Sequence, residues 1–315
     1  MVRFACALVL AIGTYVTPGQ AADAIKIVVP FAAGGPVDMV ARLVASEMQP
    51  RLGMDVIVEN RGGAGGAMAM ETVARAAQDG KTLLMGSLGS HVINPTLRGA
   101  QGYDPAKSFA PIALIGIVPS LIVVSADYPT KTLGDLISKA KQAQLSYGSA
   151  GPGTTMHIAG EQFNSAAGVK TTHVPYRGAA PAINDLLGGH IQFMNADLAV
   201  LLPQVTSGKA RAIVLFGSER TPLLPDLPTS AELGYPSMMV ENFYGILAPA
   251  GTPPDIVAKL EKAVLESVAV PSVADKLKAS GVRGTTDAKG FAAKLDRDFA
   301  FWGPEIKKLG ITAEQ

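Results

Sequence analysis

The residues of this chain that could do chemistry lie in short loops made mostly of small side chains. Five such loops each follow an apolar run and precede a helical pattern: residues 32–36, 61–66, 87–91, 150–155 and 176–179. They are rich in Gly, Ser and Thr and carry few charges. Loops of this kind expose backbone N–H groups and the positive end of a helix dipole, which together suit an anion. The pattern therefore indicates anion binding by backbone groups.

Few side chains near these loops carry charge. Only Arg61, Arg177 and His91 could add positive charge there. Asp38 falls in the first turn of a helical pattern, where a carboxylate stabilises the helix dipole, although it could instead hold an amine of a ligand. Asp197 ends a strand pattern and is either a helix N-cap or a residue of a binding cleft.

The motifs of common enzyme classes are absent from the sequence. There is no Gly-x-Ser-x-Gly, no His-Glu-x-x-His, no Gly-x-x-x-x-Gly-Lys-Ser/Thr phosphate loop and no Gly-x-Gly-x-x-Gly after a strand. The four histidines are scattered, with no pair at the spacing of metal ligands. We therefore expect no catalytic residues, no cofactor and no metal, and a binding protein rather than an enzyme.

The elements that must position these loops alternate between strands and helices. Strands are predicted at 25–31, 55–59, 82–86, 121–125, 145–149, 172–174, 190–195 and 210–216, and helices at 67–77, 133–143, 155–166, 179–187, 198–207, 255–270 and 288–308. An apolar stripe at Val40, Leu43, Val44, Met48 and Leu52 predicts one more helix, with Asp38 in its first turn. This alternation predicts an α/β fold with parallel sheets. It starts again past residue 119, and two successive units of about 100 residues each indicate two lobes. The last two helices either cap the second lobe or, as we expect, return to the first. The chain would then cross between the lobes near 119–125 and 240–247, and two crossings form a hinge.

The first 22 residues read as a secretory signal peptide. Arg3 is the only charge before Asp23, an apolar stretch follows it, and small residues at 19–22 predict cleavage near Ala22. A membrane anchor is the alternative, but the apolar stretch is shorter than the roughly 20 residues that a span needs. The single cysteine, Cys6, lies in this leader, so the exported chain would carry no thiol. With 27 basic and 26 acidic residues, the net charge gives no reason to expect nucleic acid as a partner.

Seven stretches follow one another in the order and spacing of a known family. They are IVVPFAAGGPVD at 27–38, VENRGGAGG at 58–66, DGKTLL at 79–84, YGSAGPGT at 147–154, VPYRG at 174–178, LPT at 227–229 and APAGTP at 248–253. Through them, and over nearly the whole chain after the leader, the sequence resembles the substrate-binding proteins of tripartite tricarboxylate transporters, the Bordetella-uptake-gene type of periplasmic receptor. The chain departs from this family at Phe243-Tyr244, which keep an aromatic pair only approximately. It also departs at Asn195, where many relatives have Asp, and this departure bears on the role of Asp197.

The resemblance implies an α/β periplasmic-binding-protein fold of type II, a two-lobed Venus flytrap in which each lobe is a mainly parallel sheet flanked by helices. We predict lobe 1 at residues 23–122 and 246–315 and lobe 2 at residues 123–245. The resemblance also implies a carboxylate held between the lobes by backbone and hydroxyl groups. The predicted ligand-binding residues are, in lobe 1, Phe31, Ala33, Gly34, Gly35, Pro36, Asp38, Ser87, Ser90 and His91, and, in lobe 2, Ser149, Gly151, Thr154, Thr155, Arg177, Gly178, Ala179 and Asp197.

The function expected from the loops and the resemblance is that of a periplasmic solute-binding protein. It would capture a small organic acid by lobe closure and deliver it to the membrane permease subunits of a tripartite tricarboxylate transporter, and a monomer suits such a clamshell. Two alternatives stay open. One is an exported enzyme acting on a small organic acid, and the other is a sensor subunit that presents its ligand to a membrane histidine kinase.

Overall fold

The computed structural model of the chain describes residues 24–99 and 102–312. The predicted signal peptide, residues 1–22, lies outside the described residues. None of the helices in the two described ranges combines the length and the apolar character that a bilayer crossing requires.

The first lobe is built on a parallel sheet. Its elements are β1 (Ile25–Val29), α1 (Pro36–Leu52), β2 (Val56–Asn60), η1 (Ala64–Gly66), α2 (Ala67–Ala74), β3 (Thr82–Ser87), η2 (Leu88–Ile93) and α3 (Asn94–Arg98). Strand β1 lies between β2 and β3 and is parallel to both. The carboxyl ends of the three strands therefore meet at one edge, and a β-carbon added at Gly66 would lie 2.8 Å from Ser90 Cβ and 3.0 Å from Pro30 Cβ. The three predicted loops of this lobe are thus neighbours.

The second lobe repeats this arrangement. Its elements are α4 (Leu133–Gln142), β5 (Ser146–Ser149), α5 (Thr155–Ala167), β6 (Thr172–Pro175), α6 (Ala179–Leu187), β7 (Phe193–Asp197), α7 (Leu198–Thr206) and β8 (Ala210–Leu215). Strand β5 lies between β6 and β7 and is parallel to both. A β-carbon at Gly151 would lie 3.5 Å from the Tyr176 carbonyl oxygen, so the loops after β5 and β6 also meet.

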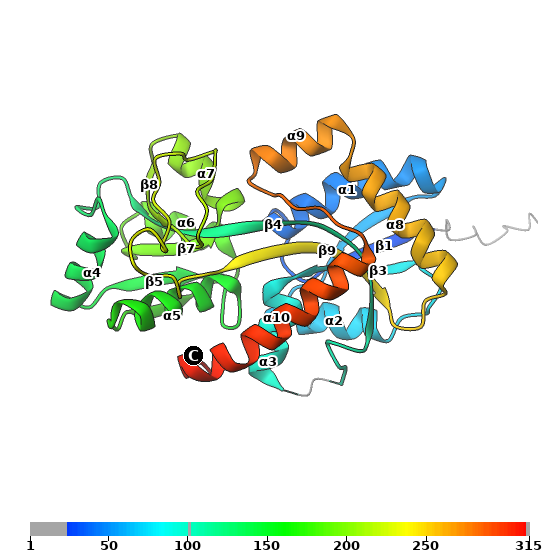
Figure 1. Cartoon of the computed structure of the whole chain (residues 1–315), viewed down its shortest axis with the longest axis horizontal. Helices are drawn as coiled ribbons and strands as arrows, with labels where there is room; N and C mark the ends of the chain where they lie inside the picture. Colours follow the sequence, from blue (N-terminus) through cyan, green and yellow to red (C-terminus); the bar gives the residue numbers. More distant parts are fainter. Residues whose placement is uncertain (1–23, 100–101, 313–315) are drawn as a thin grey trace, which may run out of the picture.

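Two long strands join the lobes. Strands β4 (Phe109–Ser125) and β9 (Glu241–Pro249) run side by side from one lobe into the other (Figure 1). They are antiparallel to each other; β9 pairs with β3 in the first lobe, and β4 pairs with β7 and β8 in the second. In the described residues this gives one nine-stranded sheet with the path β2-β1-β3-β9-β4-β7-β5-β6, and β8 joins β4 off that path. We call β4 and β9 the hinge strands.

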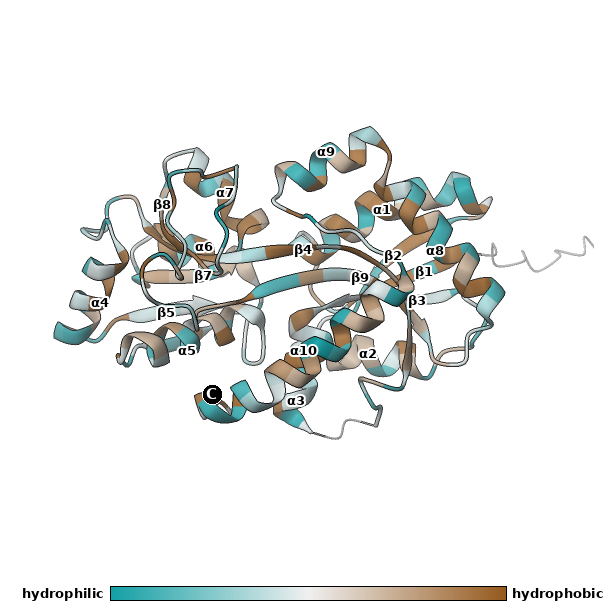
Figure 2. Ribbon diagram, in the orientation of Figure 1, coloured by the Kyte–Doolittle hydropathy of each residue, from teal (hydrophilic) through white to brown (hydrophobic). Residues whose placement is uncertain are grey.

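The C-terminal helices are α8 (Pro254–Val268), α9 (Pro271–Ala279) and α10 (Ala288–Leu309). Helix α8 packs on α1, and α10 lies along β4 and reaches the α5 end of the second lobe (Figure 1). Apolar residues cover both faces of the sheet, because Leu121 and Val123 belong to one buried cluster and Ile122 and Val124 to another. Figure 2 shows much of β4 and β7 as hydrophobic, with hydrophilic and hydrophobic residues alternating along the surrounding helices.

The sequence pattern differs from this fold mainly at the hinge. The strand predicted at 121–125 is only the last part of β4, and the crossing near 240–247 is a full strand, β9, that was not among the predicted strands. The hinge strands are antiparallel, whereas alternation alone predicts parallel neighbours. Strand β7 begins at Phe193, three residues after its predicted start. The residue boundaries of the two lobes remain a prediction.

Candidate functional site

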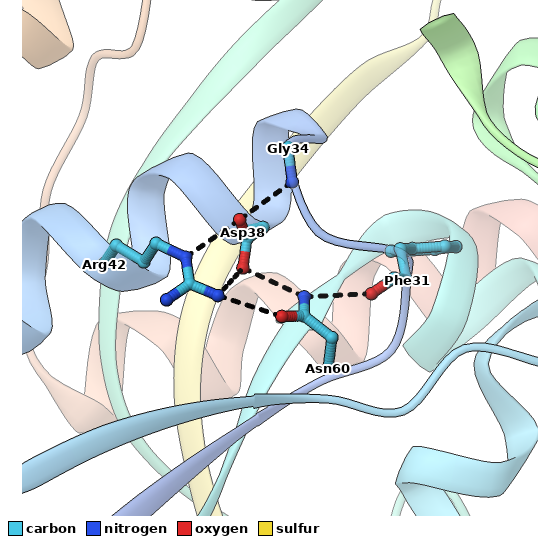
Figure 3. Close-up of polar contacts among 5 residues, drawn as sticks. All are labelled: Phe31, Gly34, Asp38, Arg42 and Asn60. Carbon is cyan, nitrogen blue, oxygen red and sulfur yellow. Dashed lines mark hydrogen bonds and ion pairs between the residues drawn. The ribbon is translucent and has the colours of Figure 1, made fainter. Parts of the chain in front are cut away.

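The loop between β1 and α1 is shaped by a buried carboxylate. Asp38 Oδ2 accepts hydrogen bonds from the Gly34 backbone N–H (2.9 Å) and from Arg42 Nε (3.0 Å). Asp38 Oδ1 accepts one from Asn60 Nδ2 (2.9 Å), and the same amide group donates to the Phe31 carbonyl (3.1 Å), as Figure 3 shows. These contacts fix both ends of the loop, so Asp38 and Asn60 determine the shape of the backbone between residues 31 and 34.

The ionised form of Asp38 is required for this arrangement. Burial alone would raise the pKa of Asp38, but the hydrogen bonds from Arg42, the Gly34 N–H and Asn60 outweigh it, and the pKa lies below its ordinary value. Because the Gly34 N–H is already used by Asp38, it is not free to bind an anion. Ala33 is exposed and Gly35 and Pro36 are half-exposed, so the loop is open to solvent just before α1.

The loop after β3 places its serines and its histidine differently. Ser87 Oγ and Ser90 Oγ lie 2.9 Å apart, both buried, and Ser87 also accepts the Ser90 N–H (3.3 Å) at the start of η2. The His91 ring is fully buried, with its centroid 5.1 Å from that of Phe109 and 6.0 Å from that of Phe299. Burial lowers the pKa of His91 to about 4, so its ring is neutral at pH 7. This packing favours a structural role for His91.

The loop after β5 is also held by its own neighbours. Ser149 Oγ lies 2.6 Å from His173 Nε2 and accepts the Gly151 N–H (3.0 Å). Thr154 is the N-cap of α5: its hydroxyl accepts the His157 N–H (3.4 Å) and donates to the Gly151 carbonyl (2.7 Å). The His157 ring stacks on that of His173 at 4.2 Å, and burial lowers the pKa of His157 to about 4. Through these contacts with Ser149 and Thr154, both histidines stabilise the loop.

The two lobes touch where η2 and α3 meet the start of α5. A β-carbon at Gly89 would lie 3.4 Å from the Thr155 backbone nitrogen, and one at Gly153 would lie 2.9 Å from Asn94 Nδ2. Thr154 and Thr155 are accordingly buried at this contact rather than exposed at an open mouth. The structure thus brings loops predicted from both lobes into direct contact.

Of the two arginines predicted to carry positive charge at the loops, Arg177 is the one without an ion pair in the described part of the chain. Arg61 pairs with Glu59 (2.7 Å) and donates to Thr72 (3.2 Å). Arg177 is exposed at the start of α6 and forms no ion pair within 4.0 Å among residues 24–99 and 102–312, and Gly178 beside it adopts φ +141°. With His91 neutral and Arg61 neutralised, a charged contact to an anion at these loops would come from Arg177. Over the same ranges no group of His, Cys, Asp and Glu side chains could hold a metal ion.

Asp197 lies at the line where the lobes and the hinge strands meet. It occupies the N-cap position of α7 but makes no side-chain capping bond. Its Oδ2 instead accepts hydrogen bonds from Asn242 Nδ2 (2.7 Å) and from the Tyr244 hydroxyl (2.8 Å) on β9. The Leu88 N–H of the first lobe donates to Asn242 Oδ1 (2.9 Å). A continuous polar chain therefore runs from one lobe through the hinge to the other.

Sequence reasoning did not select the residues that organise these loops. Asn60 and Asn242 come from strands remote from the side chains they hold. Asn60 directly precedes a predicted loop, which could have drawn attention to it. Nothing in the sequence pattern links Asn242 with Asp197.

Comparison with known proteins identifies the family. The family model described as "Tripartite tricarboxylate transporter family receptor" matches residues 40–311. The structure of the periplasmic binding protein BugD is 38% identical with a TM-score of 0.86, and the match covers 92% of this chain and 98% of BugD. MatC from Rhodopseudomonas palustris with bound malate is 35% identical with a TM-score of 0.83, covering 89% and 98% of the two chains. An R. palustris protein with adipate is 34% identical with a TM-score of 0.87, covering 91% and 97%.

These matches confirm three predictions made from the sequence: the family, the two-lobed periplasmic-binding-protein fold, and a binding protein rather than an enzyme. The chain belongs to the tripartite tricarboxylate transporter receptor family and is a solute-binding protein of the periplasmic type.

Proposed function

We propose that this protein captures a small organic anion, a carboxylate, between its two lobes in the periplasm and delivers it to the permease subunits of a tripartite tricarboxylate transporter. The observation that carries the proposal is the construction of the first loop. Asp38 and Asn60 fix the loop, and the residues exposed before α1 are Ala and Gly, which leave the backbone accessible. Two relatives whose structures contain malate and adipate support a carboxylate as the ligand class.

The proposed contacts come from both lobes. In lobe 1 they are the backbone of Ala33 and Gly35 and the N–H groups of Val37 and Asp38 in the first turn of α1, which have no partner within the helix. In lobe 2 they are Arg177 with the adjoining Gly178 and Ala179, and Asp197. We assign Asp38 and His91 to the support of the site rather than to ligand contact.

Closure follows from this division of contacts. A ligand that touches both lobes binds better when they are close together, and this difference in affinity shifts the population toward the closed form. The hinge strands β4 and β9 are the segments that must bend. The closed form, presented by the monomer, is then the one that the permease recognises.

A screen of ligands tests the proposed function. Purified protein is heated with a panel of mono-, di- and tricarboxylic acids and with matched neutral solutes such as the corresponding amides. An acid present at 100 times its dissociation constant should stabilise the native protein by about 2.7 kcal/mol. X-ray scattering with the same acid should show a smaller radius of gyration. If neutral solutes stabilise the protein and no acid does, the carboxylate proposal is wrong.

Delivery needs a separate test. Uptake of the identified acid by cells that carry the permease should require this protein and should fail with a variant that cannot bind the acid. Uptake that is unchanged by deletion of the protein would contradict the assigned partner.

A further inference from the structure

One oxygen of the Asp197 carboxylate is buried without a hydrogen bond. Asp197 is only 4% exposed. Its Oδ2 is held by Asn242 and Tyr244, whereas its Oδ1 accepts no hydrogen bond within 3.5 Å from the described part of the chain. Asp is a preferred N-cap because its side chain normally accepts a helix N–H, and here that role is not used. The carboxylate is therefore oriented by the hinge strand and not by α7.

Ser120 and Asn195, near Asp197 in the sheet, also have buried side-chain polar atoms without a hydrogen bond among the described residues. Burial raises the pKa of Asp197, and the Ser120 hydroxyl, which faces it across the β4–β7 pair, opposes this increase as a neighbouring donor, although the Ser120 Oγ lies outside hydrogen-bond geometry among the described residues. Asn195 precedes Asp197 by two residues and so lies on the same face of β7. Both polar atoms of the Asn195 amide are likewise buried and unpaired within the described ranges. Native proteins rarely leave buried polar groups in this state, because each costs about 1–3 kcal/mol.

Asp197 lies near the junction of the two lobes. It ends β7 at the edge where the loops of lobe 2 meet, and its anchor Tyr244 pairs with Ser87 of lobe 1 in the β3–β9 register. The next residue, Leu198, packs on the lobe-1 side of the boundary, since a β-carbon at Gly281 would lie 2.6 Å from Leu198 Cδ2. Asp197, with its unpaired Oδ1, is thus at the lobe junction rather than deep in either lobe.

The chemistry of Oδ1 restricts what it can bind. An ionised carboxylate only accepts hydrogen bonds, and it repels another carboxylate. A ligand acid can approach it favourably only with a hydrogen-bond donor, such as a hydroxyl or an ammonium group. We propose that Asp197 Oδ1 accepts a hydrogen bond from a donor group of the bound acid, so that the protein selects hydroxy or amino acids over plain acids of the same length. This inference rests on the proposed function and names its ligand class.

Substitution by Asn tests the inference sharply. In Asp197→Asn the amide oxygen must take the Oδ2 position, because Asn242 and Tyr244 both donate to it. The NH₂ group then occupies the Oδ1 position and donates where the native protein accepts. The variant should therefore lose the preference for donor-bearing acids and bind plain acids as well or better.

The experiment is isothermal titration calorimetry at pH 7.5 with three matched sets of acids. The sets are propionate, lactate and alanine; succinate, malate and aspartate; and glutarate, 2-hydroxyglutarate and glutamate. Within the set that binds, the native protein should bind the hydroxy or the amino acid with about tenfold or more higher affinity than the plain acid. Whichever of the two binds more tightly identifies the donor group, a hydroxyl or an ammonium. Asp197→Asn should reduce this ratio to about one or reverse it. The control, Tyr244→Phe, removes one anchor of Oδ2 without touching Oδ1, so it should keep the ratio even if every affinity falls.

Two results overturn the inference while leaving the proposed function standing. One is native protein that binds plain and donor-bearing acids equally. The other is an Asp197→Asn variant that weakens all acids by one common factor, which would make Asp197 a structural residue of the hinge. If the native protein binds no acid in these sets or in the wider screen, the proposed function fails and this inference fails with it.

Discussion

Gly35→Asp is the most direct test of anion recognition by the first loop. Gly35 is the N-cap of α1 and has extended backbone angles, φ −79° and ψ 171°, that any residue can adopt. A β-carbon there would meet only the Ala32 carbonyl oxygen, at 3.6 Å, which is an ordinary contact. Helix α1 has no side-chain cap, so Asp or Asn at this position can supply one. Both variants should fold with a stability within a few tenths of a kcal/mol of the native protein.

The expected loss of binding comes from charge. A ligand carboxylate held at the start of α1 would lie on the order of 4 Å from the new carboxylate. At an effective dielectric constant of about 20, two like charges at that distance repel by about 4 kcal/mol. This corresponds to a dissociation constant roughly 10³-fold higher. Gly35→Asn has the same shape without the charge, so its affinity should fall by less than about tenfold.

Calorimetry with the acid found in the ligand screen measures the difference. The loss of affinity in the Asp variant, relative to the native protein, should become smaller as salt is raised from about 0.05 M to 0.5 M, because ions screen exposed charges. The Asn variant should show no such dependence on salt. Thermal unfolding of both variants checks that the fold is intact. Equal affinities of the Asp and Asn variants would refute recognition of an anion at this loop.

Four substitutions, measured by unfolding, test which side chains stabilise the fold. Asp38→Ala leaves the Gly34 N–H and Asn60 without their acceptor and should lower the free energy of unfolding by about 3 kcal/mol in urea, whereas Arg42→Ala, with its side chain half exposed, should lower it by about 1 kcal/mol or less; equal losses would contradict the role given to Asp38. His91→Leu should make the free energy of unfolding depend less on pH below about 6.5. Burial lowers the pKa of His91 to about 4, so its contribution is present above its unfolded pKa near 6.5 and is lost, by about 3 kcal/mol, as the pH falls toward 4; urea curves that stay parallel over this window would contradict this. Asp197→Asn should act with the opposite sign. Burial raises the pKa of Asp197 to about 6, so the native protein loses free energy of unfolding as the pH rises from 4 through 6, and the variant should gain about 3 kcal/mol relative to it between pH 4 and 7. If the variant shows no such gain, the carboxylate is better solvated than its burial indicates.

Local patterns were sufficient where each element carries its own signals. The helix predicted at 179–187 has the bounds of α6, since a glycine precedes it and the apolar stripe ends at its last residue. The strands β1, β2 and β3 and the loops that follow them were also predicted within two residues. In contrast, Pro111 and Pro119 interrupt the apolar run of β4, so the pattern predicted only its last five residues as strand.

The candidate site was predicted at the level of loops but not of contacts. Spacing placed His91 beside Ser87 and Ser90, but the wide turn of η2 directs its ring between Phe109 and Phe299. Partners separated by tens of residues leave no local signal in a single sequence. For this reason the hydrogen bonds that shape the loops became visible only in the folded chain.

The shared sheet has a consequence for how the molecule comes apart. Strands β4 and β9 contribute backbone hydrogen bonds and buried side chains to both lobes, so neither lobe can lose its structure without exposing unpaired strand edges and apolar surface of the other. We therefore expect the two lobes to unfold together as one cooperative unit. A ligand that binds only the native protein should then stabilise both lobes, including the strand edges farthest from its site.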